Sequence, residues 1–160
     1  MKLPTNDRVQ QGIFIDKVGI QQGVYATAIE PEVKEFLIAV DDIGAVAAFA
    51  FDHPETLIGQ RLELAGDALT PAQTAKAISA ATGFPVQAEH IPLADFMRQN
   101  PGYGQVIDFF NRHGFDVDIP ALRVLHPGLL DFETWLAKTG KAKFAELFRT
   151  HARVLEGTAQ

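Results

Sequence analysis

Nucleophilic catalysis in this chain would depend on a single serine. Ser79 lies in the middle of the helical pattern AQTAKAISAAT, without the Gly-x-Ser-x-Gly turn that exposes a hydrolase nucleophile. The chain has no cysteine, which excludes disulfides, thiolate nucleophiles and thiolate metal ligands. We therefore expect Ser79 to be a small residue that packs within its helix, and we predict no catalytic residue.

Metal binding is not favoured by the spacing of the histidines. No two of them stand three or four residues apart, the separation that places two ligands on one helix face. His113 falls at an expected helix end, and His90 falls inside an expected strand, where a hydrogen-bonded core residue is commoner than a general base. The sequence therefore predicts no metal site among His53, His90, His113, His126 and His151.

Two adjacent acids, Asp41 and Asp42, precede nine residues without a polar side chain, Ile43 to Phe51. Paired carboxylates can exchange protons in catalysis, but adjacent residues at a strand-to-helix turn point in different directions. A carboxylate at this place can instead accept the unpaired N–H groups of the first helical turn. We expect the helix to begin at Asp41 or Asp42 and one of the two acids to cap it.

The residues that usually serve nucleotide-dependent reductases are also absent from the sequence. The tyrosines, Tyr25 and Tyr103, have no lysine four residues later, so the Tyr-x-x-x-Lys pair of many short-chain reductases is absent. No Gly-x-Gly-x-x-Gly or Gly-x-x-Gly-x-x-Gly turn is present, and the Gly-x-Gly of PGYGQ follows a proline without a preceding strand. We predict no cofactor-binding residue in this chain.

One aromatic cluster remains as a candidate site. Its members are Tyr103, Phe109, Phe110 and Phe115. Packing within the core is the simpler expectation for such a cluster, and the wall of a small-ligand pocket is the alternative.

Strand and helix signals alternate along the chain. The sequence predicts strands at Lys34–Val40, Arg61–Gly66 and Pro85–Ile91, the second with Leu62 and Leu64 facing inward. It predicts a helix ending before Pro54, and later helices at 71–82 (capped by Thr70 and ended by Gly83), from Asn100 to His113, at 129–138 and at 141–155, the last two separated by Gly140. Short strands with packed helices indicate an α/β fold, organised as an α+β lobe.

Composition narrows the class of protein further. The 160 residues are 47% hydrophobic and 21% charged, which is ordinary for a globular domain. The net charge of -6 argues against nucleic-acid binding, which needs a basic surface. The first 20 residues lack a signal peptide, and the longest apolar run is too short for a membrane span. We expect a cytoplasmic protein that binds no nucleic acid and no membrane.

Several motifs together resemble one family. They are IAVDDIG (38–44), the acid-His-Pro-Glu stretch at 52–55, IGQRLELAGD (58–67), LTPAQ (69–73) and LLDFETWL (129–136). Their order and spacing resemble the C-terminal half of NmrA-like proteins, an atypical branch of the extended short-chain dehydrogenases. The likeness runs from Gln21 to Gly140. We expect a weakly structured segment at 1–20, an NmrA-like lobe at 21–140, and a C-terminal helix and tail at 141–160.

The resemblance implies how the lobe works in a larger protein. Family members are typically about twice this length, and their first half is a Rossmann domain whose glycine-rich turn binds NADP(H). Some members are redox-sensing regulators, and others reduce quinones or small carbonyl compounds. The glycine-rich half has no counterpart in this chain, so NADP(H) is expected only for a full-length member.

Three functions follow as hypotheses. The first is a non-catalytic regulatory or substrate-binding lobe, the second is part of an NAD(P)H-dependent reductase, and the third is a stand-alone small-ligand binder. The apolar helix that contains Ile43 to Phe51 would lie against the nucleotide-binding domain in the family, or against later helices of this chain. We expect such a lobe to self-associate or to bind a protein partner.

Overall fold

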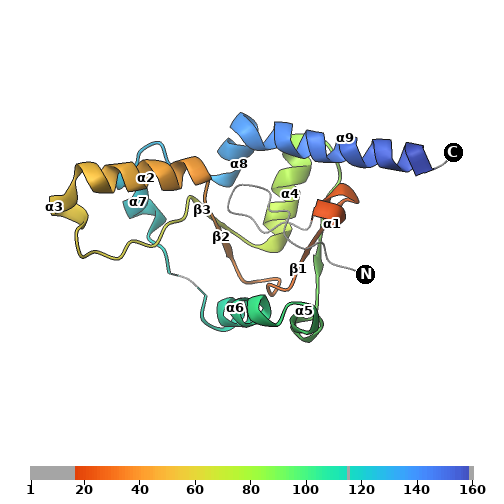
Figure 1. Ribbon diagram of the computed structural model, residues 1–160, viewed down its shortest axis with the longest axis horizontal. Helices are drawn as coiled ribbons and strands as arrows, with labels where there is room; N and C mark the ends of the chain where they lie inside the picture. Colours follow the sequence, from red (N-terminus) through yellow and green to blue (C-terminus); the bar gives the residue numbers. More distant parts are fainter. Residues whose placement is uncertain (1–16, 115, 159–160) are drawn as a thin grey trace.

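The computed structural model describes residues 17–114 and 116–158, which form short strands surrounded by helices (Figure 1). In chain order the elements are α1 (Lys17–Gln21), β1 (Val24–Thr27), β2 (Glu35–Leu37), α2 (Val40–Asp52), α3 (Pro54–Leu57), β3 (Asp67–Leu69), α4 (Pro71–Thr82), β4 (Gln87–His90), α5 (Leu93–Gln99), α6 (Pro101–His113), α7 (Ile119–Leu125), α8 (Phe132–Trp135), the π-helical turn η1 (Leu136–Gly140) and α9 (Lys141–Thr158). This arrangement confirms the predicted mixture of few short strands with packed helices.

The strands form two separate pairs. β1 and β4 are parallel, with Val24 opposite Gln87 and Thr27 opposite His90. β2 and β3 are antiparallel, with Glu35 opposite Leu69. α4 connects β3 to β4 and lies between the strands and α9 (Figure 1).

The ends of α4 follow the sequence signals. The Thr70 hydroxyl accepts a hydrogen bond from the Gln73 N–H, and the Gln73 side chain accepts one from the Thr70 N–H. Gly83 ends the helix in the left-handed conformation, with φ of 73°. Ser79 accepts from the Val86 N–H at 2.8 Å, so this serine joins α4 to the turn that leads into β4.

The main core lies between α4, the strands and the C-terminal helices. Ile20, Ile78, Leu136 and Phe144 are almost completely buried there, and Trp135 stacks on Phe132. The full cluster of buried residues is Ile20, Tyr25, Leu37, Ala39, Ala75, Ile78, Val86, Phe132, Trp135, Leu136 and Phe144. Because Ile20 of α1 belongs to it, the segment boundary expected at residue 20 falls within a packed helix.

A second, smaller core lies under α5 and α6. Ala28, Ile29 and Ile107 are buried, with Phe96, Tyr103 and Phe110 packed against them. A Cβ atom at Gly104 would lie 2.5 Å from Met97 Cγ, so glycine permits the close approach of α6 to α5.

The capping prediction for Asp41 and Asp42 is wrong. α2 begins at Val40 with Ala39 as its N-cap, and neither acid makes a capping hydrogen bond. Asp42 is buried and its carboxylate accepts from the Leu130 N–H at 3.0 Å, with His126 Nε2 at 3.2 Å from the other oxygen. The acid therefore connects α2 to a segment almost ninety residues later in the chain, a contact that the local sequence does not reveal.

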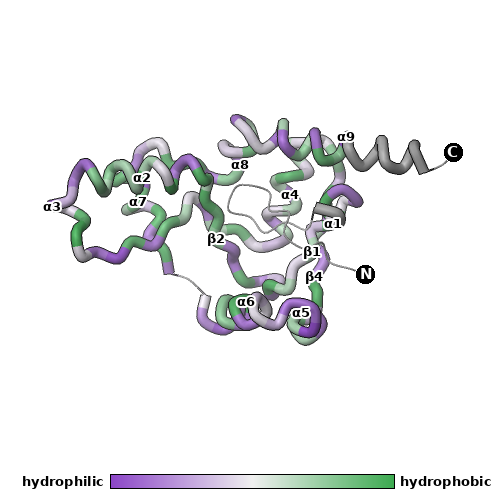
Figure 2. Tube along the Cα trace, in the orientation of Figure 1, coloured by the Kyte–Doolittle hydropathy of each residue, from purple (hydrophilic) through white to green (hydrophobic). Residues whose placement is uncertain are grey.

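α2 is only partly covered by the described chain. Val46 is buried, but Ile43 is 40% and Phe51 is 85% exposed. Hydrophobic colour predominates along α2, which extends with α3 away from the main core (Figure 2). The later helices that the structure describes therefore do not bury the whole apolar surface of α2.

Two other sequence predictions are wrong in detail. Residues 61–66 form no strand, and Leu62 is 41% exposed rather than inward-facing. Gly140 does not separate two helices, because α8, η1 and α9 follow one another without a break. Gly140 is buried instead, and a Cβ there would lie 2.5 Å from Trp135 Cζ3. Among the described helices, none is long and apolar enough to cross a membrane.

Candidate ligand-binding cavity

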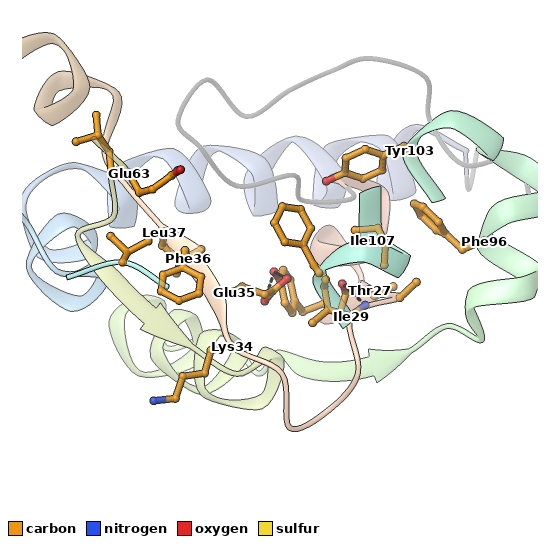
Figure 3. Close-up of a pocket in the computed structure, with 16 residues that line it drawn as sticks. Thr27, Ile29, Lys34, Glu35, Phe36, Leu37, Glu63, Phe96, Tyr103 and Ile107 are labelled. Carbon is orange, nitrogen blue, oxygen red and sulfur yellow. Dashed lines mark hydrogen bonds between the residues drawn. The ribbon is translucent and has the colours of Figure 1, made fainter. Parts of the chain in front are cut away.

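A cavity of about 320 Å³ lies between the two cores (Figure 3). Strands β1 and β2 supply one side, and α5 and α6 supply the other. The lining residues are Tyr25, Ala26, Thr27, Ala28, Ile29, Lys34, Glu35, Phe36, Leu37, Glu63, Leu64, Phe96, Tyr103, Ile107, Phe110 and Val117. Most of these side chains are apolar or aromatic, as in pockets that enclose small organic molecules.

Glu35 places a carboxyl group in this apolar lining. It is the first residue of β2, and its carboxyl oxygens lie 3.0 and 2.9 Å from the hydroxyl of Tyr25, which donates to them. Tyr25 comes from the neighbouring strand β1 and is 3% exposed. The two strand pairs therefore meet at this hydrogen bond, drawn as a dashed line in Figure 3.

The surroundings of the cavity raise the pKa values of Glu35, Tyr25 and Tyr103. Burial raises the pKa of the Glu35 carboxyl to about 7, although the Tyr25 hydrogen bond partly opposes that effect. Burial and the nearby Glu35 raise the pKa of Tyr25 well above its ordinary value, and they raise the pKa of Tyr103 to about 12. Near neutral pH the tyrosines are neutral, and Glu35 is divided between its acid and its carboxylate.

The predicted aromatic cluster is only partly assembled here. Tyr103 and Phe110 line the cavity, on the same face of α6 as the buried Ile107. Phe109 is 50% exposed on another face of α6, where its ring contacts those of Phe110 and His113. Phe115 lies outside the described residues.

Sequence reasoning missed the polar centre of the cavity, Glu35 and Tyr25. The available signal was the acid inside the strand-forming run KEFLIAV, where a charged residue needs a reason. Tyr25 is ten residues away and belongs to a strand that was not predicted, so the pair itself was hidden.

The other candidate residues serve local contacts. His53 lies 3.5 Å from a Glu55 oxygen. The strand residue His90 is exposed rather than in the core, with its Nε2 3.7 Å from a Glu30 oxygen. Within the described residues, no group of three or more histidine or acidic side chains is placed to hold a metal ion.

The two glycines of PGYGQ do not form a turn that could hold the pyrophosphate of a dinucleotide. Gly102 and Gly104 lie inside α6 rather than in a turn between a strand and a helix. Met97 packs against Gly104, so the space beside this glycine is filled and is not open to a phosphate.

Comparison with known proteins decides the family. The sequence model of the NmrA-like family matches residues 3–124, three quarters of the chain. This chain belongs to the NmrA-like family. The recognition made from the sequence motifs is thereby confirmed.

Solved structures show the same fold at low sequence identity. NmrA, a negative transcriptional regulator, in complex with NADP, is 18% identical and superposes with a TM-score of 0.57. A trigonal crystal form with NAD gives 0.55 at 18% identity, and a monoclinic form gives 0.54 at 19%. Each match covers 77% of this chain and 44% of the NmrA chain, so the chain spans less than half the length of these structures.

Proposed function

We propose that this chain is the small-molecule-binding lobe of an NmrA-like protein and that it has no catalytic activity of its own. The cavity between the two cores carries this proposal. It combines a mostly apolar lining with the partly buried carboxyl of Glu35, the arrangement by which proteins bind and orient small organic molecules. A lobe that binds a small molecule suits a regulatory protein. The NmrA structures to which this chain is similar are of a transcriptional regulator.

A second candidate is the substrate lobe of an NAD(P)H-dependent reductase. The observation in its favour is that relatives of the same fold hold NADP or NAD, while this chain corresponds to 44% of their length. In this candidate the nucleotide belongs to the remaining part of the family fold. Assaying a full-length relative that contains this lobe for NADPH oxidation with small carbonyl compounds separates the two candidates.

The binding proposal is tested by calorimetric titration of this chain with 2-naphthylmethanol, a neutral aromatic probe. Val117→Trp fills the cavity, and Val124→Trp, at an 83% exposed position of α7 outside the cavity, is its matched control. We expect binding to the unmodified chain and to V124W, and at least tenfold weaker binding to V117W. Equal binding to both variants, or no binding to the unmodified chain, would overturn the proposal.

The same titration with NADPH tests the absence of nucleotide binding. We expect no binding to this chain alone, because the described residues provide no pyrophosphate-binding turn. A micromolar dissociation constant would show that the nucleotide site is present here after all.

A further inference from the structure

The charge inside the cavity is not balanced. Of the two acids that line it, Glu63 has a cationic partner, since Arg61 Nε donates to it at 2.7 Å. The Glu35 carboxyl has its hydrogen bond with Tyr25, and among residues 17–114 and 116–158 no arginine or lysine forms an ion pair with it. Lys34 is adjacent in sequence, but its side chain is directed away from Glu35 (Figure 3). Within the described residues, the Glu35 carboxyl therefore has no cation paired with it.

The raised pKa of Glu35, about 7, is consistent with that imbalance. A nearby cation would favour the carboxylate and lower the pKa. A positively charged group of a ligand could therefore replace the proton on the Glu35 carboxyl.

Aromatic rings surround the same space. Tyr25, Phe36, Phe96, Tyr103 and Phe110 all line the cavity, and the rings of Phe96 and Tyr103 lie 5.9 Å apart at 58°. The faces of aromatic rings attract cations, particularly where water is excluded. A carboxylate together with several aromatic walls is a chemical match for an organic ammonium group.

We propose that the cavity binds a small apolar molecule that carries a protonated amine, with the ammonium group against Glu35 and the apolar part against Phe96, Tyr103 and Phe110. This inference rests on the proposed binding function and names its ligand class. An anionic ligand is disfavoured, because it would meet the charge of Glu35, with which no arginine or lysine of the described residues forms an ion pair.

The charged and titratable groups around Glu35 determine how binding varies with pH. They are Tyr25 on β1, Tyr103 on α6, Lys34 beside it in sequence, and Glu63 with Arg61 at the edge of the cavity. The tyrosines stay neutral because burial raises the pKa of each. Glu35 is thus the cavity group that changes its charge near pH 7, and amine binding should strengthen as it ionises.

The test uses three probes with the same ring and different charge: 2-naphthylmethylamine, 2-naphthylmethanol and 2-naphthoic acid. We expect the amine to bind the unmodified chain tightest at pH 8 and about tenfold more weakly at pH 6, where Glu35 is mostly protonated. The alcohol should bind with the same affinity at both pH values, and the acid should bind most weakly.

Glu35→Gln keeps the size of the side chain and removes its charge. We expect this variant to bind the amine at least tenfold more weakly at pH 8 and the alcohol within twofold of the unmodified chain. Glu89→Gln, which alters an exposed acid of β4 outside the cavity, is the matched control and should change neither affinity.

The outcomes separate this inference from the proposed function. If the alcohol binds but the amine shows no preference and no pH dependence, the ligand class is wrong and the binding function stands. If the alcohol is preferred at pH 6 and lost in E35Q, protonated Glu35 donates to a neutral ligand and the amine proposal is overturned. If none of the probes binds, the binding function itself fails. The pH series on the unmodified chain keeps the test valid even if E35Q does not fold.

Discussion

Asp42 is a buried acid and Glu35 a partly buried one, and their hydrogen-bond partners differ. Asp42 accepts from the Leu130 N–H at 3.0 Å and lies 3.2 Å from His126 Nε2, so each of its oxygens has a hydrogen-bonding partner. Glu35 has the neutral hydroxyl of Tyr25. The contacts of Asp42 stabilise the fold. Glu35 reduces the stability of the fold when it ionises, and it is suited to a binding site.

The first prediction concerns Glu35 and pH. Its folded-state pKa, about 7, lies above its ordinary value, so the folded chain holds this proton more strongly than the unfolded chain. The stabilising contribution is present below the ordinary pKa and is lost as the pH rises through about 7. We compare the free energy of unfolding of E35Q with that of the unmodified chain. As the pH rises from 5 to 8, we expect the difference to shift in favour of E35Q by roughly 1–3 kcal/mol. Urea denaturation across this range checks it, and a difference that does not vary with pH would refute it.

The second prediction concerns Asp42. Asp42→Ala would leave the Leu130 N–H without its acceptor, and an unsatisfied buried donor costs about 1–3 kcal/mol. Asp41→Ala is the control, because Asp41 is exposed and should change the free energy of unfolding by less than about 0.5 kcal/mol. Equal effects of the two variants in urea denaturation would show that the Asp42–Leu130 contact contributes no more to stability than an exposed acid does.

For single helices and strands, the sequence predicted correctly those ends that are formed by contacts between residues close together in the chain. The Thr70–Gln73 capping box and Gly83 act within one helix, and the predicted bounds of α4 are confirmed. Asn100, Pro101 and Gly114 likewise delimit α6, although the Asn100 side chain makes no cap hydrogen bond. Short elements such as β1, β3, α5 and α7 have too few residues for a periodic pattern, and their contacts come from distant parts of the chain.

The cavity was predictable only in part for the same reason. Tyr103 and Phe110 stand on one face of α6, a relation that helical spacing contains. Their meeting with Glu35 and Tyr25 depends on how the two strand pairs pack against α6, which is a tertiary arrangement. The same holds for the Asp42–Leu130 contact, where an acid in a capping position has a distant partner.

The third prediction compares two glycines within helical segments. A Cβ at Gly140 would lie 2.5 Å from Trp135 and 2.9 Å from Leu136, so Gly140→Ala should cost about 1–3 kcal/mol of overpacking. Gly44 in α2 has no atom within 4 Å of such a Cβ, and Gly44→Ala should stabilise the helix by about 0.5–1 kcal/mol. Thermal unfolding of both variants should give opposite signs. A stabilising Gly140→Ala would contradict the packing described for η1.

At the scale of the whole molecule, the described chain leaves apolar surface at one end. Phe51 of α2 and Ile58 after α3 are 85% and 80% exposed. Helices α2 and α3 extend to one end of the molecule (Figure 1). Exposed apolar side chains that are close together commonly mark a contact with another protein surface.

The fourth prediction is that the purified chain self-associates through this end. Phe51→Ser together with Ile58→Ser should shift light scattering at micromolar concentration toward the mass of one chain, 17.5 kDa. Val106→Ser, at a 42% exposed position of α6, is the control and should leave the mass unchanged. A monodisperse single chain before any substitution would show that the surface needs no cover.

Methyl NMR of the isoleucines shows directly whether the space between the two cores receives a small molecule. Ile29 and Ile107 line the cavity, while Ile20 and Ile78 belong to the main core away from it. On titration with 2-naphthylmethanol, we expect the signals of Ile29 and Ile107 to shift in saturable fashion and those of Ile20 and Ile78 to stay in place. Shifts confined to exposed residues such as Ile43 and Ile58, or no shifts at all, would contradict the account.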